Sequence, residues 1–375
     1  MRLFQITGCT LLSVWLPWMA AVLAPNTAMA EQRFDLEETY PISAEGTIAL
    51  TTRDADVTII GSDRDDVHVE IHWRRTLTGI GAADVDFRVD VSSDGGDLII
   101  EERRRNGVSM AVGVMRTRYD VLIEAPAGVS LRLEGDDDNY DIRDVNGAIA
   151  IASDDGEIRL RSCRGDDFDL KFEDGSLEMD SGRGSLRLRY DDGEADLRNA
   201  AFETVRVQAN DGTLRLRGDL AREGRYEFSL DDGDAHLRLG DTARGDFTFT
   251  MADGSLAIDG GRGSIEVRYD DGDAVLRGGA FERLRVQAGD GALEFDGLVP
   301  LGASHVIRLD DGDVRFRARD GGGRISARFD DGNVDAGQSL RVISDSEHGA
   351  TYEWGDGDAS VDIDFNDGQV RLAAP

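Results

Sequence analysis

The chain has 375 residues, of which 75 are acidic and 42 basic, giving a formal net charge of −33 at pH 7. A protein this acidic repels phosphate groups, which argues against nucleic acids and anionic lipids as its main partners. Its hydrophobic content of 40% is too high and too regularly spaced for a disordered acidic tail. Cations, basic proteins and neutral glycans remain compatible partners.

Residues 1–30 predict a secretory signal peptide. Arg2 precedes an apolar run that extends to Leu23, and Ala28-Met29-Ala30 has the A-x-A form of a cleavage site. Cys9 precedes the apolar run instead of following it, so we expect no lipid anchor. No other stretch reaches the ~18 apolar residues that a membrane-spanning helix needs. We expect a mature protein that begins at Glu31, lies in the periplasm, at the cell surface or in the medium, and is monomeric without a transmembrane segment.

Residues 31–125 predict an irregular β region. In residues 67–73, apolar Val67, Val69 and Ile71 alternate with polar side chains, which is typical of a strand with one buried face. The segment from Arg103 to Arg118 is basic and contains two glycines, and we expect a long exposed loop there.

Residues 126–375 predict a repetitive β domain. Asp-Gly pairs recur between alternating apolar and polar runs, a pattern that indicates turns joining strands. Counted from each glycine, positions −7, −5, −3, +2 and +4 are usually apolar, and the glycines follow one another at 18 to 21 residues. They are Gly156, Gly175, Gly193, Gly212, Gly233, Gly254, Gly272, Gly291, Gly312 and Gly332. A period near 20 residues indicates stacked structural repeats.

Two architectures fit this all-β pattern. One is a single-chain β-solenoid of about 20-residue rungs with Asp-Gly turns, and the other is an antiparallel β-meander. The solenoid is favoured because each rung needs only its neighbours, whereas an open meander of so many strands is uncommon. Residues 189–212 and 268–291 are identical at 17 of 24 positions, so a unit of four rungs is duplicated. The solenoid predicts inward, stacked rings for Phe172, Tyr190, Phe228, Phe249, Tyr269, Phe316 and Phe329.

Several short motifs carry a family resemblance. They are Gly46-Thr47-Ile48, Asp56-Val57-Thr58-Ile59, Asp66-Val67-His68-Val69, residues 121–128 with the sequence VLIEAPAG, and residues 145–149 with the sequence VNGAI. Over residues 45–372 the chain resembles the putative adhesin family of unknown function, related to the auto-transporter adhesin head (GIN) domain. The resemblance implies a β-solenoid outside the cytoplasmic membrane with no established enzyme activity. The Asp-Asp-Gly corners depart from the family pattern, so no ligand preference is carried over.

The most visible candidate site is an aspartate ladder, formed by the residues that precede the turn glycines. Its members are Asp155, Asp174, Asp192, Asp211, Asp232, Asp253, Asp271, Asp290, Asp311 and Asp331. Their carboxylates can form the turns by accepting local backbone N–H groups, or they can bind Ca²⁺ as hard oxygen ligands. Outward arginines such as Arg159 and Arg187 can offset their repulsion by pairing with acids on neighbouring rungs, so we expect turn formers and no required cofactor.

Three other features can carry chemistry. His68, Glu70 and His72 project from one strand face at a spacing that can present zinc, although a solvated polar face is the simpler interpretation. Cys163, the only cysteine left after cleavage, has no histidine nearby in sequence and cannot form an intrachain disulfide. Residues 337–355 interrupt the repeat and contain His348, Tyr352 and Trp354, which indicates a C-terminal cap more than an enzyme loop.

No catalytic residue is therefore predicted. We expect a non-enzymatic envelope protein, an adhesin-like binding or scaffold rod whose partner is an unknown envelope protein or glycan. The alternatives are a carbohydrate-active β-helix enzyme and a calcium-stabilised structural β-roll.

Overall fold

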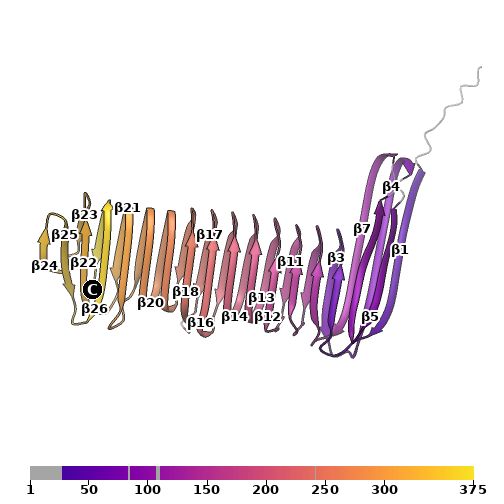
Figure 1. Ribbon diagram of the computed structural model, residues 1–375, viewed down its shortest axis with the longest axis horizontal. Helices are drawn as coiled ribbons and strands as arrows, with labels where there is room; N and C mark the ends of the chain where they lie inside the picture. Colours follow the sequence, from indigo (N-terminus) through magenta and orange to yellow (C-terminus); the bar gives the residue numbers. More distant parts are fainter. Residues whose placement is uncertain (1–27, 83–84, 107–109, 241) are drawn as a thin grey trace, which may run out of the picture.

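The computed structural model describes residues 28–82, 85–106, 110–240 and 242–375, and in this part of the chain it contains 27 strands and no helix. Figure 1 shows a straight rod of stacked coils with longer strands at its N-terminal end. Neighbouring coils pair in parallel, residue by residue, as between Leu186 and Val205. The predicted β-solenoid is confirmed, and the antiparallel meander is wrong.

Each regular coil has two faces joined by an Asp-Gly corner. Face 1 contains strands that precede the corner: β2 (Thr47–Thr51), β8 (Ser130–Glu134), β10 (Ile149–Ala152), β12 (Asp167–Lys171), β16 (Arg222–Leu230) and β18 (Arg244–Met251). Face 2 contains strands that follow it: β3 (Asp56–Ser62), β9 (Asn139–Arg143), β11 (Glu157–Arg161), β15 (Thr213–Gly218), β17 (Asp234–Leu239) and β19 (Ser255–Asp259). Four strands continue around a corner and contribute to both faces: β13 (Ser176–Tyr190), β14 (Glu194–Ala209), β20 (Arg262–Leu298) and β21 (Ser304–Ala318).

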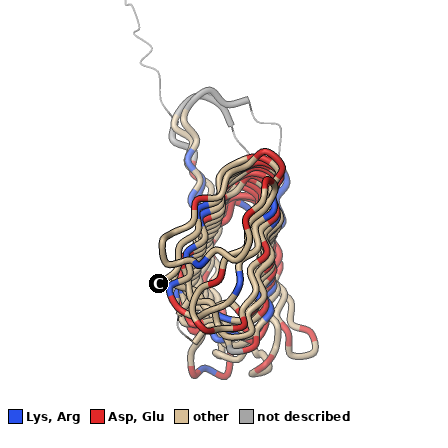
Figure 2. The backbone as a smooth tube through the Cα atoms, turned by 90° about the vertical axis from the view of Figure 1, so that its left-hand side faces the viewer, with Lys and Arg blue, Asp and Glu red and all other residues tan. Residues whose placement is uncertain are grey.

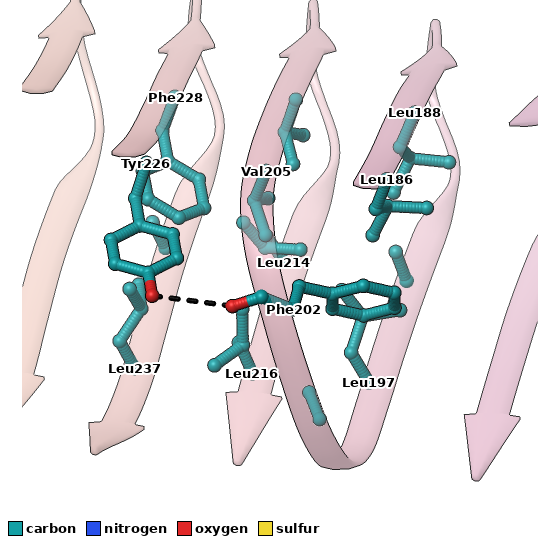
Figure 3. Close-up of a cluster of buried hydrophobic side chains, with 14 of the residues drawn as sticks. Leu186, Leu188, Leu197, Phe202, Val205, Leu214, Leu216, Tyr226, Phe228 and Leu237 are labelled. Carbon is teal, nitrogen blue, oxygen red and sulfur yellow. Dashed lines mark hydrogen bonds between the residues drawn. The ribbon is translucent and has the colours of Figure 1, made fainter. Parts of the chain in front are cut away.

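The core lies between the two faces, where the alternate apolar side chains of successive coils stack along the rod (Figure 3). Of the seven aromatic residues predicted to lie inward, six are buried and Phe329 is half-buried. Phe172 stacks on Tyr190 at 5.2 Å between ring centroids, and Phe228 stacks on Phe249 at 4.7 Å.

Tyr269 lies inward as predicted and is 5% exposed. The expectation that its ring stacks on another ring is wrong, because Met251 and Ala288 occupy the same position in the coils on either side. Its hydroxyl donates a hydrogen bond to the carbonyl of Ala292 at 3.2 Å instead.

The turn glycines are required by close stacking of the corners. A Cβ atom built on Gly212 would lie 2.5 Å from the carbonyl oxygen of Gly193, and one on Gly233 would lie 2.5 Å from that of Gly212. Only some of these glycines, such as Gly291 with φ +128°, also adopt the left-handed backbone region. The repeat therefore needs glycine mainly because one corner packs directly on the backbone of the previous one.

Long antiparallel strands close the N-terminal end of the rod. This N-terminal cap consists of β1 (Ala28–Pro41), β4 (Asp66–Ala82), β5 (Val85–Asp94), β6 (Asp97–Asn106) and β7 (Met110–Pro126). Strand β4 pairs with both β1 and β7. The long loop predicted for Arg103–Arg118 is wrong for the described part of that segment, because residues 103–106 belong to β6 and residues 110–118 to β7, while residues 107–109 lie outside the described residues. The flanking residues extend β6 and β7, and β7 is held by its long pairing with β4. The described residues begin at Ala28, so the predicted signal peptide and Cys9 lie almost entirely outside them.

At both ends of the rod the chain runs outward and then returns. Near the N-terminus β2 pairs with β6 on one side and with β8 on the other. The C-terminal end contains β22 (Gly323–Phe329), β23 (Asn333–Ala336), β24 (Arg341–Ser346), β25 (Gly349–Trp354), β26 (Ala359–Asp367) and β27 (Gln369–Ala373). There β26 lies between β21 and β22, so the last coil in sequence is not the last in space. The antiparallel strands β24 and β25 form the cap that the broken repeat at residues 337–355 predicted.

Candidate functional site

The aspartate ladder runs along one edge of the rod. All ten ladder aspartates are exposed, and Figure 2, which looks along the rod, shows acidic residues concentrated at the upper edge of the coils. The pKa of Asp192 is raised above its ordinary value by desolvation and then by the charges of Asp211 and Asp174, and that of Asp232 is raised for the same reasons. The ladder is thus a stripe of mutually repelling carboxylates.

The ladder side chains do not form the turns. Among the described residues no ladder carboxylate has a hydrogen bond or ion pair, so the prediction that they accept local N–H groups is wrong. Backbone bonds between coils hold the corners, as when the Asp192 N–H donates to the Glu173 carbonyl at 3.2 Å. The aspartate after the glycine accepts instead: Asp273 Oδ1 receives the Ala292 N–H at 3.1 Å. Within the described chain no three ladder carboxylates converge closely enough to hold one cation.

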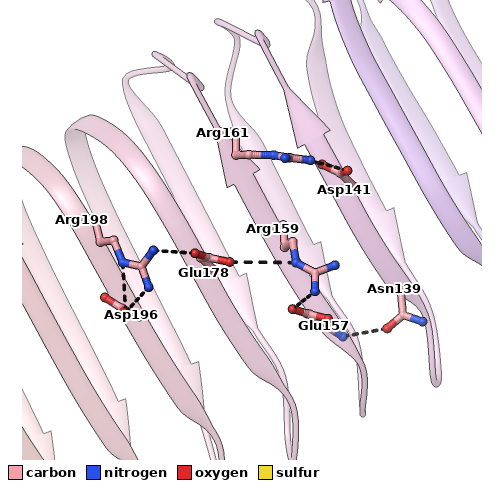
Figure 4. Close-up of polar contacts among 8 residues, drawn as sticks. All are labelled: Asn139, Asp141, Glu157, Arg159, Arg161, Glu178, Asp196 and Arg198. Atoms are coloured by element: carbon pink, nitrogen blue, oxygen red, sulfur yellow. Dashed lines mark hydrogen bonds and ion pairs between the residues drawn. The ribbon is translucent and has the colours of Figure 1, made fainter.

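Face 2 carries a ladder of ion pairs between outward arginines and acids. Figure 4 shows Arg198 contacting Asp196 and Glu178, and Glu178 lying 3.9 Å from Arg159, which also pairs with Glu157. The predicted pairing of outward arginines with acids across rungs is confirmed here. Because these side chains are exposed, each pair contributes at most about 1 kcal/mol.

Face 1 contains a groove of 1010 Å³ that crosses seven coils beside the acidic edge. One wall presents guanidinium, amide and hydroxyl groups: Arg189, Gln208, Ser229, Thr250, Arg268, Gln287 and Arg308. The opposite wall is the corner itself, with Asn210, Asp231, Ala252, Asp270, Gly289 and Asp310. The short side chains of Ser229, Thr250 and Ala252 lie in its middle, and Arg189 and Arg308 lie at its two ends.

The groove can bind an elongated polar ligand. Successive coils are ~4.8 Å apart, so seven coils span about 29 Å along the rod. Donors on one wall and carboxylate acceptors on the other can bind both lone pairs and protons of hydroxyl groups. The sequence analysis did not predict this groove. Its walls are formed by the residues at positions −4 and −2 from each turn glycine, and a run of short side chains at those positions was the signal that could have indicated it.

The histidines of β4 are arranged differently from the sequence prediction. His68 Nε2 lies 3.0 Å from Glu70 Oε1, but His72 Nδ1 lies 2.9 Å from Asp35 Oδ1 on the neighbouring strand. The third residue near His68 and Glu70 is Glu37, and the three ligand atoms lie within 4.8 Å of one another. The predicted grouping of His68, Glu70 and His72 is therefore split between two clusters.

Two acids lie where the coils meet the N-terminal cap: Asp138 is fully buried and Glu102 is half-buried. Asp138 accepts hydrogen bonds from Thr52 Oγ1 at 2.9 Å, the Ala55 N–H at 2.5 Å and the Tyr140 hydroxyl at 3.1 Å. Burial raises the pKa of Asp138 to about 6 and that of Glu102 to about 7. The three donors give Asp138 a structural role in holding the first corners. The sequence shows a run of three acids at residues 136–138, but nothing in it indicates that the Asp138 side chain points into the core.

Neither Cys163 nor His305 is placed for catalysis. Cys163 is fully buried, and burial raises the pKa of its thiol to about 11, which suppresses the nucleophilic thiolate. His305 is also fully buried, its Nε2–H donates to the Phe281 carbonyl at 3.0 Å, and burial lowers its pKa. In the duplicated unit, 79 residues earlier, Tyr226 donates to Phe202 in the same way (Figure 3). His305 therefore occupies in the core the position that Tyr226 has in the other copy of the unit.

These observations define the class of protein: a parallel β-solenoid, closed at both ends by antiparallel strands, with a polar groove along one face. The chain belongs to the Toastrack family, DUF4097, whose model matches residues 46–262, from just before β2 to the first residue of β20. No curated protein matches the chain.

Three solved structures resemble the chain at low sequence identity. A putative cell adhesion protein from Clostridium sporogenes is 11% identical, with 93% of this chain and 100% of that chain covered and a TM-score of 0.17. A putative adhesin from Parabacteroides merdae is 10% identical, with 92% and 97% covered and a TM-score of 0.26. A putative adhesin from Bacteroides fragilis is 8% identical, with 90% and 97% covered and a TM-score of 0.20.

Proposed function

We propose that this protein is a non-enzymatic rod of the cell envelope that binds an elongated neutral glycan along the face 1 groove. The observation that carries the proposal is the continuous groove across seven coils, from Arg189 to Arg308. A site that repeats with each coil suits a repeating polymer more than a single small molecule. The short motifs by which the chain resembles the putative adhesin family support a role in adhesion.

The charges of the groove favour a neutral polyhydroxylated chain. The acidic edge, with Asp231, Asp270 and Asp310, repels anionic polymers. The facing wall offers Arg268 and Gln287 as donors, so hydroxyl groups find acceptors on one side and donors on the other. A second hollow of 500 Å³ lies on the same face and is lined by both arginines and acids.

The proposed location follows from the N-terminal sequence. Ala28-Met29-Ala30 completes a signal peptide, and no helix in the described residues is long and apolar enough to span a membrane. We infer a monomer in the periplasm or at the cell surface. Mass spectrometry of the exported protein should show an N-terminus at Glu31, and a retained leader or a lipid on Cys9 would contradict it.

Binding can be tested on an array of envelope glycans with a matched pair of variants. Thr250→Trp places a bulky side chain in the middle of the groove, whereas Ala257→Trp places one on the outside of face 2. We expect the unmodified protein and Ala257→Trp to retain a neutral glycan that Thr250→Trp loses. Equal binding by both variants would exclude the groove, and binding only of envelope proteins would replace the glycan as partner.

A further inference from the structure

The outer face of the N-terminal cap groups polar side chains in rows across three strands. Antiparallel pairing of β1 with β4 sets Asp35 opposite His72, Glu37 opposite Glu70, and Thr39 opposite His68. Residues directly opposite in an antiparallel pair have Cβ atoms about 5 Å apart, so the Glu37 and Glu70 carboxylates repel each other.

Arginine neutralises the other acids of this face but not these two. Asp35 pairs with Arg33 at 2.5 Å, and Glu31 pairs with Arg74 at 3.1 Å. Acids on this face of β4 and β7 also pair with arginines: Asp120 with Arg118, and Asp66 and Glu124 with Arg64. Among the described residues, Glu37 has no ion pair, and Glu70 has only His68 at 3.0 Å. This is the one row of the face where two opposed carboxylates lack a permanent positive charge within the described chain.

The His68 ring is oriented from both sides. Its Nδ1 lies 3.3 Å from the Thr39 hydroxyl, and its Nε2 faces Glu70. A hydroxyl partner on one ring nitrogen fixes the ring and directs the other nitrogen toward a ligand position, as around metal-bound histidines. The side chains of His68 and Glu70 are 21% and 33% exposed, so the cluster is partly sheltered while remaining open to solvent.

We propose that Glu37, His68 and Glu70 form a zinc site that joins β1 to β4. The nearest ligand atoms, all within 4.8 Å, require only side-chain adjustment to surround one ion, and water completes a tetrahedral set. An imidazole nitrogen with two carboxylates suits Zn²⁺, whereas Ca²⁺ takes oxygen ligands only. Bound zinc supplies the missing positive charge between the opposed glutamates.

The site would fasten the first strand of the rod. Strand β1 is an edge strand that pairs only with β4, and its apolar residues Phe34, Leu36 and Tyr40 are only partly buried. A ligand that binds only the folded form stabilises it by mass action, so zinc holds β1 in place. The site lies outside the groove-bearing coils, and the inference does not rest on glycan binding.

Isothermal titration of the purified protein with zinc chloride, without a histidine tag, tests the site. We expect one tight site per chain above the weak binding of an acidic surface. Glu37→Gln and His68→Gln should each weaken it about tenfold or more, whereas His72→Gln and Glu38→Gln should leave it within about twofold. His72 is the alternative histidine on the same strand face, and Glu38→Gln removes the same charge from the neighbouring residue.

Hydrogen exchange gives a readout that a surface charge effect would not produce. Zinc should slow exchange of the β1 amides in the unmodified protein and not in Glu37→Gln. In chelator each of the four variants should still melt in one cooperative transition, which shows that each is folded. The proposal is overturned if Glu37→Gln binds zinc as tightly as the unmodified protein, or if His72→Gln loses binding as His68→Gln does.

Discussion

The regular coils and the N-terminal cap both stack strands, but they place their charged groups differently. In the coils a residue's position in the repeat decides its environment, and outward acids meet arginines of neighbouring coils, as Glu178 meets Arg198 at 2.7 Å. At the cap, burial raises the pKa of Glu102 to about 7, and Tyr119 beside it has a buried hydroxyl without a partner in the described chain. Repetition places the same kinds of charged group at the same positions of successive coils, whereas Glu102 at the cap has an environment that does not recur along the rod.

The difference has a physical origin. A coil contacts only its two neighbours, so an outward acid can pair with an arginine of the next coil, as Glu227 pairs with Arg206. The cap must cover the open end of both faces and join long strands from distant parts of the sequence, such as β4 and β7. Its polar groups therefore meet partners that have no counterpart elsewhere in the rod. Variants in the two regions should respond to different conditions.

The largest loss of stability is expected from a substitution that breaks the alternation of buried and exposed residues in a coil. Tyr269→Asp puts a carboxylate into the core at a position that is 5% exposed, so we expect a loss of more than about 4 kcal/mol in unfolding free energy. Arg268→Asp, one position away, changes an exposed side chain that contacts Glu266 at 2.5 Å, and should cost about 1 kcal/mol. Thermal melts of the two variants give the comparison, and equal losses would contradict the inward and outward assignment.

The coils could be predicted from sequence because their alternation and their turns are local signals. The burial of Phe172, Phe249 and Tyr269 follows directly from their distance to the next Asp-Gly pair. Residues 361–372 carry the same pattern around Gly368, yet nothing local indicates that β26 returns between β21 and β22. The position of β26 depends on which strands still have an unpaired edge when the C-terminal segment folds back onto the rod.

The candidate sites were less predictable because they too depend on contacts between segments that are distant in the sequence. His68 and Glu70 were singled out by their spacing on one strand, but Glu37 enters only through the register between β1 and β4. Asp138 occupies a corner where later coils have glycine, and its three hydrogen-bond donors come from two different coils. Pairing register between distant segments is the information that a single sequence lacks.

A smaller change in stability is expected from the titration of Glu102, which lies at the junction of cap and coils. Because the pKa of Glu102 is about 7 in the folded protein and near 4.3 in an unfolded chain, the folded state holds a proton that the unfolded state has lost. Stability associated with this group therefore falls as pH rises from about 4.3 to about 7. Glu102→Gln removes the titration and should raise the melting temperature by a few degrees at pH 7.5, with a gain that shrinks toward pH 4.5.

The quantity to measure is the difference in melting temperature between Glu102→Gln and the unmodified protein at each pH. Burial lowers the pKa of His305, so His305 makes the whole protein less stable as pH falls and opposes Glu102 in a single melting curve. Subtraction removes that contribution because both proteins contain it. Glu173→Gln, at an exposed corner, is the matched control and should show no comparable gain. A Glu102→Gln gain that does not change with pH would refute the assignment.

The smallest effect is expected from removing calcium, because nothing in the ladder geometry requires the ion. The corners are joined by backbone hydrogen bonds such as that between Asp192 and Glu173, and no three ladder carboxylates of the described chain converge. Chelator should then leave the coils folded. The pKa of Asp192 and that of Asp232 are raised by desolvation and then by the charges of neighbouring aspartates, and added monovalent salt should stabilise the coils modestly by screening that repulsion.

A calcium-dependent roll would behave otherwise, since one site at a calcium concentration 100 times its dissociation constant contributes about 2.7 kcal/mol and several sites contribute more. The measurement is a thermal melt in chelator and then in millimolar calcium at fixed ionic strength, made on Glu37→Gln so that the chelator does not act through the proposed zinc site. We expect a shift of a few degrees at most. Loss of β-structure in chelator, restored by calcium but not by matched sodium chloride, would show that the ladder binds calcium, because screening alone cannot distinguish two salts of equal ionic strength.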